Sequence, residues 1–392
     1  MSRFAKGKHP AIELPHEYVR NAYKSAIGSS RRDLITPALI LDLEVARRNI
    51  NFITQRMSKL HAKLRPHIKV QKCVELARLQ IEAGAIGVCT ATVWEAIIMS
   101  RAGVKDVLIA NQVVGKQKID SLAEAAKEGY LTVTVDDPQN AEDLSDSVCR
   151  AGSKLDVLIE VDVGMGRGGV RSSQEAVALA QRIGKLPGLR FRGVQGYEGQ
   201  CMLEADRDLR IKKAHEAMNY LGTVIDHLTT AGFHCEVVSA GGTGTYDITG
   251  ANPQVTEIQA GSYVFMDNFH GNLVPEFSQS LTVLGTVVIH HGNTIVFDCG
   301  RKSIGIDYVP PTMVDYPFCQ ARNFAEEHAL FDVDEHIMLN VGDTMEFIPG
   351  YAGTTVNLYD AFHVVESGEV VDIWPVTPRG PGHGGLLTSP SQ

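Results

Sequence analysis

Arg65-Pro66-His67-Ile68-Lys69 ends the apolar run that begins at Leu64, and this stretch decides the fold that we expect. It places a lysine at the C-terminal end of a strand, the end that forms the catalytic face of a (β/α)8 barrel. A lysine enclosed there loses solvation, so its pKa falls and its free amine becomes a nucleophile. The stretch therefore predicts Schiff-base chemistry at Lys69, with a substrate carbonyl or with pyridoxal 5'-phosphate (PLP). A surface lysine after an edge strand is the alternative.

The chain around this lysine alternates short apolar runs with longer amphipathic stretches. Strands are expected at residues 38–43, 64–70, 86–91, 106–111, 131–136, 155–163, 191–196 and 235–239, and helices at 45–60, 74–83, 93–102, 176–183 and 206–231. Eight β units separated by helices are typical of an α/β fold with a parallel sheet. The count of eight and the even spacing favour a closed (β/α)8 TIM-type barrel. A doubly wound open sheet is the alternative.

The pattern changes after residue 280, where helical periodicity becomes scarce. Short strands are expected at residues 281–290, 294–297, 329–331, 344–347, 356–357, 362–365 and 370–374. They predict a smaller antiparallel β domain over residues 276–378, after a barrel over residues 36–275. Residues 1–35 are expected to form an N-terminal arm or helix that packs on the β domain. Residues 379–392, rich in Pro, Gly and Ser, are expected to be a flexible tail.

The composition is that of a globular protein without a nucleic-acid or membrane partner. Hydrophobic residues make up 44% of the chain, and the formal net charge is -9, so we expect poor binding to nucleic acids or anionic membranes. No apolar run approaches the ~20 residues that span a bilayer. The polar, basic start of the chain does not resemble a secretory signal. The 7 cysteines are scattered without a CxxC motif, which favours reduced thiols and a cytoplasmic location.

A glycine-rich run follows the eighth expected strand. Ser239-Ala240-Gly241-Gly242-Thr243 offers backbone N–H groups and hydroxyls that can approach an anion closely. Loops after the seventh and eighth strands of a barrel commonly form a phosphate site. This position favours a phosphate-binding loop over a merely flexible one.

Two further strand ends bring polar side chains to the same mouth. Residues 160–169 end the sixth expected strand and carry Arg167, where a rigid cation can face a cofactor oxygen or ring nitrogen. A surface ion pair is the alternative for Arg167. Gln195, Tyr197 and Glu198 end the seventh expected strand, and they either line the cofactor ring or pack as ordinary loop residues.

Seven motifs in order along the chain carry a family resemblance. They are Pro37-Ala38, RPHIK at 65–69, VDVGMGRGG at 161–169, GYEG at 196–199, SAGGTGTY at 239–246, QAGSY at 259–263 and TVNLYD at 355–360. Together they resemble the D-threonine aldolase and eukaryotic-type D-serine dehydratase family, which has the alanine racemase-like fold. The resemblance covers nearly the whole chain. It implies a PLP-binding barrel, a C-terminal β domain and a homodimer in which the partner subunit closes each active site.

The resemblance also implies roles for individual residues. Lys69 becomes the lysine that binds PLP covalently. The cofactor-binding residues implied by the resemblance, together with those favoured by position, are Lys69, Thr92, Arg167, Gln195, Tyr197, Ser239, Gly241, Gly242 and Thr243. The expected partner is a small-molecule substrate, an amino acid.

One departure from the family pattern lies just before the TVNLYD motif. Family members usually carry a His-x-Cys or His-x-Asp pair there, which binds a divalent metal beside the cofactor. Here Tyr351 and Gly353 occupy the two positions. Because glycine has no side-chain ligand and a neutral phenol is a poor one, we expect no metal at the usual site. His270, His363 and His383 have no spacing that indicates a ligand set.

The departure leaves several reactions open. The resemblance favours a PLP-dependent lyase that cleaves a D-3-hydroxy-amino acid to glycine and an aldehyde, as D-threonine aldolase does. A dehydratase that releases ammonia is the next candidate. Without a metal, Tyr351 could act as the base if neighbours lower the pKa of its phenol from ~10. A racemase or epimerase using Lys69 and Tyr351 also stays open, as does a PLP-binding protein without turnover.

Overall fold

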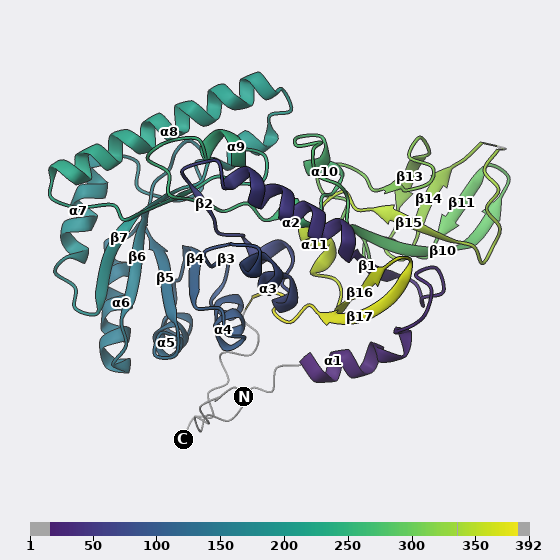
Figure 1. Ribbon diagram of the computed structural model, residues 1–392, viewed down its shortest axis with the longest axis horizontal. Helices are drawn as coiled ribbons and strands as arrows, with labels where there is room; N and C mark the ends of the chain where they lie inside the picture. Colours follow the sequence, from purple (N-terminus) through teal and green to yellow (C-terminus); the bar gives the residue numbers. More distant parts are fainter. Residues whose placement is uncertain (1–15, 335, 383–392) are drawn as a thin grey trace.

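A computed structural model describes residues 16–334 and 336–382 of the chain, and two sheets dominate it (Figure 1). A parallel sheet with helices around it forms one part, and a mainly antiparallel sheet forms the other. The parts of the expected arm and tail at residues 1–15 and 383–392, His383 among them, lie outside the described residues.

The parallel sheet has eight strands within the described ranges, in the order β2-β9-β8-β7-β6-β5-β4-β3. The strands are β2 (Lys63–Leu64), β3 (Val88–Thr90), β4 (Asp106–Gln112), β5 (Tyr130–Val135), β6 (Leu155–Glu160), β7 (Leu189–Gly196), β8 (Val237–Ala240) and β9 (Glu257–Ile258). A parallel bridge between His67 and Cys89 joins the first and last strands of this order, and the Cys89 N–H donates to the Pro66 carbonyl at 2.8 Å. The sheet is therefore closed into a TIM-type barrel, and the open-sheet alternative is wrong.

Helices cover the outside of the barrel (Figure 1). They are α2 (Leu43–Met57), α3 (Val74–Glu82), α4 (Val93–Arg101), α5 (Lys116–Ala125), α6 (Pro138–Ala151), α7 (Ser173–Ile183), α8 (Arg207–Thr230) and α9 (Tyr246–Thr249). Short polar side chains start several of them, because such side chains accept hydrogen bonds from the free N–H groups of a first turn. Asp42 accepts from the Val45 N–H at the start of α2, and Ser172 accepts from the Glu175 N–H at the start of α7.

One expected barrel strand lies in the other sheet. β1 (Ala38–Asp42) pairs antiparallel with β10 (Leu281–His291) and parallel with β16 (Ala361–Glu366), both of which belong to the C-terminal part of the chain. The eighth barrel strand is instead β9, which pairs with β2 and β8 and is too short for a periodic pattern. The chain thus enters the antiparallel sheet before the barrel begins, and the boundaries at residues 36, 276 and 378 stay predictions.

The second sheet has nine strands in the part of the chain that the structure describes, and its main path is β13-β14-β11-β10-β1-β16-β17. Besides β1 these are β10 (Leu281–His291), β11 (Thr294–Phe297), β12 (Thr312–Met313), β13 (Gln320–Phe324), β14 (Ala329–Asp332), β15 (Thr344–Ile348), β16 (Ala361–Glu366) and β17 (Glu369–Pro375). The strand expected at 356–357 is wrong, because helix α11 (Ala352–Val356) runs into that stretch. Helix α1 (His16–Tyr23) contacts β17, and Arg20 pairs with Asp372 at 2.6 Å.

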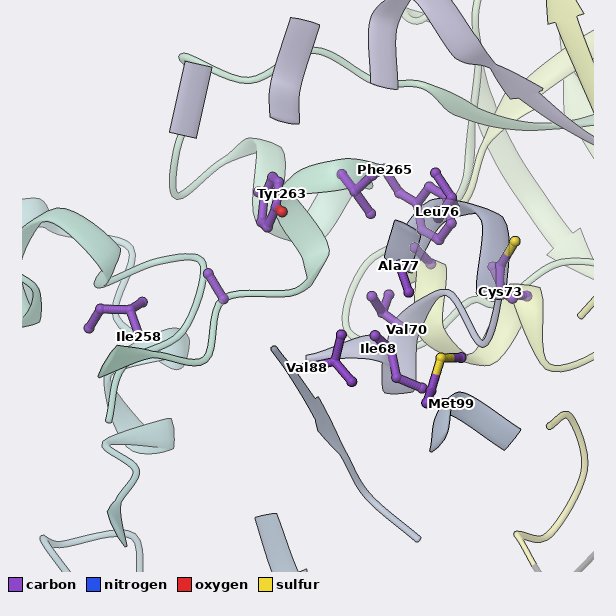
Figure 2. Packing of buried hydrophobic residues seen from close by; sticks show 14 of the residues in the cluster. Ile68, Val70, Cys73, Leu76, Ala77, Val88, Met99, Ile258, Tyr263 and Phe265 are labelled. Carbon is purple, nitrogen blue, oxygen red and sulfur yellow. The ribbon is translucent and has the colours of Figure 1, made fainter. Parts of the chain in front are cut away.

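A continuous hydrophobic cluster joins the two parts of the molecule. It contains residues of the barrel, such as Ile68 and Phe265, and residues of the antiparallel sheet, such as Phe362. The Phe265 and Phe362 rings lie 5.5 Å apart between centroids. Figure 2 shows Ile68 and Val70 in the same buried cluster as Val88, so the turn that carries Lys69 is anchored in the core.

Candidate active site

A pocket opens at the C-terminal face of the barrel, with about 740 Å³ of space not filled by protein atoms, including the part open to solvent. It brings together eight of the residues singled out from the sequence. They are Lys69, Arg167, Gln195, Tyr197, Gly241, Gly242, Thr243 and Tyr351. The pocket also contains His67, Gln259 and His270, which had no role predicted from the sequence.

Lys69 lies in the short 3-10 helix η2 (Ile68–Val70), directly after barrel strand β2. Its neighbours Ile68 and Val70 are buried, which fixes the backbone while the lysine side chain faces the pocket. The surrounding protein lowers the pKa of the Lys69 amine through desolvation, and the positive charge of Arg167 lowers it further. The amine is reachable from the pocket, and both effects favour its nucleophilic form.

The Tyr197 ring lies near two cations of the pocket. The Lys69 Nζ and the Arg167 Cζ each lie 5.8 Å from the centroid of the Tyr197 ring. Attraction between a cation and an aromatic face extends to about 6 Å. Both cations of the pocket therefore lie within reach of the same aromatic ring.

Glu160, at the end of β6, lies beside Arg167 and accepts hydrogen bonds from neighbouring amide side chains. Its carboxylate lies 3.7 Å from the Arg167 guanidinium and accepts hydrogen bonds from Gln112 at 3.2 Å and Gln195 at 3.1 Å. Burial raises the pKa of Glu160 to about 7; Arg167 opposes this rise and Asp136 adds to it. The protonation of Glu160 is thus coupled to the charge and position of Arg167.

Gln195 is tied to the next two strands through its side-chain amide. The Gln195 Oε1 accepts from Gln259 Nε2 at 2.8 Å, and the same nitrogen donates to the Ser239 Oγ at 2.7 Å. Ser239 is buried and does not line the pocket, so it acts here as a support for Gln259.

Hydrogen bonds to the Glu198 carboxylate hold the glycine-rich loop after β8 in place. This carboxylate is fully buried and accepts from the Gly241 N–H at 3.0 Å and from the hydroxyls of Thr245 at 2.7 Å and Thr249 at 2.5 Å. Glu198 therefore shapes the loop, and it is not among the residues that line the pocket.

At Gly242 the loop backbone comes close to the Tyr197 ring of the pocket wall. A Cβ added there would lie 3.2 Å from the Tyr197 ring, so glycine leaves space that any other residue would fill. Thr243 lies beside it, and its Oγ1 accepts from the Tyr263 N–H at 3.2 Å. A glycine-lined space facing a reactive amine fits the phosphate and the aldehyde ends of PLP.

Thr92 lies behind the pocket wall and does not line the pocket. It begins helix α4, where its Oγ1 accepts from the Glu95 N–H at 3.2 Å. Its neighbour Ala91 lines the pocket, and Glu95 pairs with Lys72 at 3.3 Å. The arrangement gives Thr92 a helix-capping role one residue from the site.

Tyr351 lines the pocket from its position directly before α11, and its surroundings disfavour a phenolate. Burial, together with the charge of Asp267, raises the pKa of Tyr351 to about 12. This is the opposite of the shift that a phenolate base requires. A Cβ added at Gly353 would lie 3.0 Å from the Tyr351 ring, so the ring occupies the space that a side chain at position 353 would need.

His270 and Asp267 form a polar pair beside Tyr351 that was not predicted from the sequence. The His270 Nδ1 lies 2.8 Å from the Asp267 Oδ1, and the His270 ring stacks on Tyr351 with centroids 5.8 Å apart. The available signal was an aspartate three residues before a histidine, which places both side chains on one face of the short helix α10 (Asn268–Gly271). Among the described residues, no cluster of three or more His, Cys, Asp or Glu side chains could hold a metal ion.

Known sequences match both parts of the chain. The profile of the alanine racemase N-terminal domain matches residues 41–269, and that of a putative serine dehydratase domain matches residues 280–365. D-threonine aldolase from Arthrobacter sp is 34% identical over 88% of this chain and 93% of its own length. 3-Hydroxy-D-aspartate aldolase from Paracoccus denitrificans (strain Pd 1222) is 33% identical over 91% of this chain and 95% of its own length.

Solved structures agree with this assignment. The crystal structure of D-threonine aldolase from Filomicrobium marinum superposes with a TM-score of 0.88 at 34% identity, covering 90% of this chain and 98% of that one. D-threo-3-hydroxyaspartate dehydratase from Delftia sp. HT23 superposes with a TM-score of 0.81 at 25% identity, over 89% of this chain and 98% of its own. The chain therefore belongs to the alanine racemase N-terminal domain family, in the branch of the D-threonine aldolases and their dehydratase relatives.

Proposed function

We propose that this protein is a PLP-dependent lyase that cleaves a D-3-hydroxy-amino acid to glycine and an aldehyde. The observation that carries this proposal is the pocket at the barrel mouth, where the Lys69 amine and the Arg167 guanidinium both lie 5.8 Å from the centroid of the Tyr197 ring. The aldolase names of relatives that span nearly the whole chain support the same reaction.

Different residues of the pocket would hold different parts of PLP. The Lys69 amine would hold the cofactor covalently, and Gly241, Gly242 and Thr243 would hold its phosphate. Bound PLP supplies an electron sink for a carbanion at the substrate α carbon. Arg167 would face the cofactor ring, and Glu160 would set the position of Arg167.

A dehydratase is the second candidate reaction. The serine dehydratase profile matches residues 280–365, and this segment includes β15 and the strands that position the loop before α11. In dehydration a base removes the α proton and the hydroxyl leaves from the β carbon, so ammonia and a keto acid follow. The two reactions share the pocket and differ in the bond that breaks.

We also propose that the protein is a homodimer with shared active sites. Two large apolar side chains beside pocket residues are exposed: Leu203, which follows Met202 of the pocket wall, at 70%, and Tyr308 at 65%. The Tyr308 ring lies 5.3 Å from the Tyr351 ring between centroids. A partner subunit that closes the active site would cover these two exposed side chains. Light scattering should give twice the mass of one chain.

A cytoplasmic location and independence from a divalent metal complete the proposal. Cysteines 73, 89, 149, 201, 235, 299 and 319 are free, which fits a reducing compartment. No helix among the described residues is long and apolar enough to cross a membrane. The Tyr351 ring packed on Gly353 leaves no side-chain ligand at position 353.

The test is incubation of chelator-treated, PLP-loaded protein with D- and L-3-hydroxy-amino acids and simple amino acids. Aldehyde, keto acid with ammonia, and the opposite enantiomer are assayed together. We expect aldehyde and glycine from D-substrates. Keto acid with ammonia would make the dehydratase correct, and enantiomer without either product would make the protein a racemase.

A further inference from the structure

We propose that His270, oriented by Asp267, is the general base that removes the β-hydroxyl proton of the substrate. This inference rests on the proposed lyase function. Retro-aldol cleavage needs a base at that hydroxyl, and Tyr351 is a poor candidate because its phenol is held in the protonated form. The pocket offers two histidines instead, His67 and His270.

Asp267 fixes which nitrogen of His270 carries the proton. The Asp267 side chain is fully buried, and its Oδ1 accepts from the His270 backbone N–H at 2.8 Å. Its Oδ2 accepts from the Ala352 N–H at 2.7 Å. A carboxylate held in this way accepts the third hydrogen bond, from the His270 Nδ1–H at 2.8 Å. The neutral ring then carries its lone pair on Nε2.

Tyr351 and Asp267 hold the His270 ring from two sides. The rings of His270 and Tyr351 are stacked with an interplanar angle of 26°, while Phe269 packs edge-on against His270 at 5.1 Å. His270 is only 6% exposed, and it lines the same pocket as Lys69. The His270 ring is therefore held in one orientation in the wall of the pocket that contains the Lys69 amine. Tyr351 acts as a positioning residue.

His67 has the opposite tautomer and does not suit this task. Its Nδ1 accepts a long hydrogen bond of 3.5 Å from the Lys69 backbone N–H, so its neutral ring carries the proton on Nε2. Burial, together with the charge of Lys69, lowers the pKa of His67 well below its usual value, which keeps the ring neutral. Nε2 of His67 is thus a donor, whereas Nε2 of His270 is an acceptor.

The step balances with these groups. The His270 Nε2 takes the β-hydroxyl proton, and the O–H electron pair becomes the second bond of the aldehyde carbonyl. The bond between the α and β carbons breaks, and its electron pair stays on the α carbon. One proton then adds to the α carbon to give glycine, and His270 releases its own, so no oxidant or other co-reactant is needed.

The test compares holoenzyme variants in two assays after removal of metals with a chelator. The variants are His270→Gln and the control His227→Gln, an exposed histidine of α8 whose Nδ1 lies 2.8 Å from the Thr223 carbonyl of the same helix. The first assay measures aldehyde release from D-threonine and D-phenylserine. The second follows exchange of the glycine α proton in deuterated water, which needs PLP and Lys69 but no base at a β-hydroxyl.

We expect His270→Gln to lose aldehyde release about 100-fold or more, the usual share of a general base, and to keep glycine exchange within about threefold of wild type. His227→Gln should match wild type in both assays. The inference is overturned if His270→Gln keeps more than about a tenth of the aldehyde release or loses both activities together. Wild-type cleavage that disappears with the chelator and returns with a divalent metal would also overturn it.

A second variant guards against a folding defect. His270→Ala should be inactive alone and should recover aldehyde release when imidazole is added, because the small base fills the vacated position. Failure of imidazole to restore any release would count against the base role. If wild type releases no aldehyde from any D-3-hydroxy-amino acid, the lyase proposal itself fails, an outcome distinct from an active wild type with an active His270→Gln.

Discussion

Lys69 is the residue on which the chemistry depends, and its setting makes a direct prediction. Replacing it with alanine removes the amine that the lowered pKa keeps nucleophilic. Lys69→Ala should therefore lose the colour of bound PLP that borohydride can reduce, while Lys63→Ala, at an exposed lysine of β2, should keep it. Absorbance before and after borohydride treatment checks this. Reducible colour that persists in Lys69→Ala would assign the attachment to another lysine.

Glu160 predicts a pH dependence of stability. Its folded-state pKa of about 7 lies above the ordinary value of 4.5, so the folded protein binds the extra proton between these values. Its contribution to stability is present below pH 4.5 and is lost as the pH rises through 7, by up to about 3 kcal/mol. The free energy of unfolding of wild type relative to Glu160→Gln should fall by this amount between pH 4.5 and 7.

Urea unfolding at several pH values measures this difference. Glu216→Gln, at an exposed carboxylate on α8, serves as the control and should show no such trend. A difference between wild type and Glu160→Gln that stays flat across this range would mean that Glu160 ionises normally.

The sequence alone was enough to predict pocket residues that follow strands. It was not enough to predict pocket residues whose setting depends on contact with another side chain. Lys69 and Arg167 follow apolar runs, so their position at the barrel mouth can be inferred from the chain alone. His270 looked like an isolated histidine, because its partnership with Asp267 and its contact with Tyr351 depend on how α10 and the loop before α11 meet. The pKa of Tyr351 likewise depends on burial that no pattern encodes.

At the scale of elements, the glycine-rich loop after β8 allows a prediction about PLP affinity when a side chain is added at the expected phosphate site. Gly242→Ala would put a Cβ 3.2 Å from the Tyr197 ring, which must then shift slightly. We expect the Kd of PLP to rise on the order of tenfold, equal to ~1.4 kcal/mol. Gly184→Ala is the matched control, since its nearest added contact is an ordinary 3.5 Å. Equilibrium dialysis measures the Kd of PLP for both variants, and equal values would mean that Gly242 does not take part in phosphate binding.

Elements also show where the pattern along the chain stops being informative. The run at 38–43 has the composition of a buried strand, and it forms one, but its partners β10 and β16 lie more than 200 residues away. Barrel closure needs β9, two residues long, whose place is fixed by pairing with β2 and β8. Strand identity follows from local composition, whereas strand partners follow from tertiary packing.

At the scale of the whole molecule, the connection between the two sheets predicts how the protein unfolds. β1 lies in the middle of the antiparallel sheet although it precedes the barrel in the chain, and the main hydrophobic cluster runs through both parts. Neither part can lose its structure without exposing surface of the other. We therefore expect the barrel and the antiparallel sheet to unfold together in one cooperative transition.

The chain offers a reporter for each part, because it has 2 tryptophans. Trp94 lies in α4 beside the barrel and Trp374 in β17 of the antiparallel sheet, and both are buried. Trp374→Phe leaves fluorescence from the barrel alone, and Trp94→Phe leaves it from the sheet alone. In urea unfolding, the fluorescence midpoint of each variant should equal the midpoint that circular dichroism gives for the same variant.

Phe362→Ala, which removes the ring packed on Phe265, should lower both fluorescence midpoints equally, with a loss of unfolding free energy of about 3–5 kcal/mol. If the Trp374 signal changes at lower urea than the Trp94 signal, the antiparallel sheet unfolds independently, and the shared core does not couple the two parts.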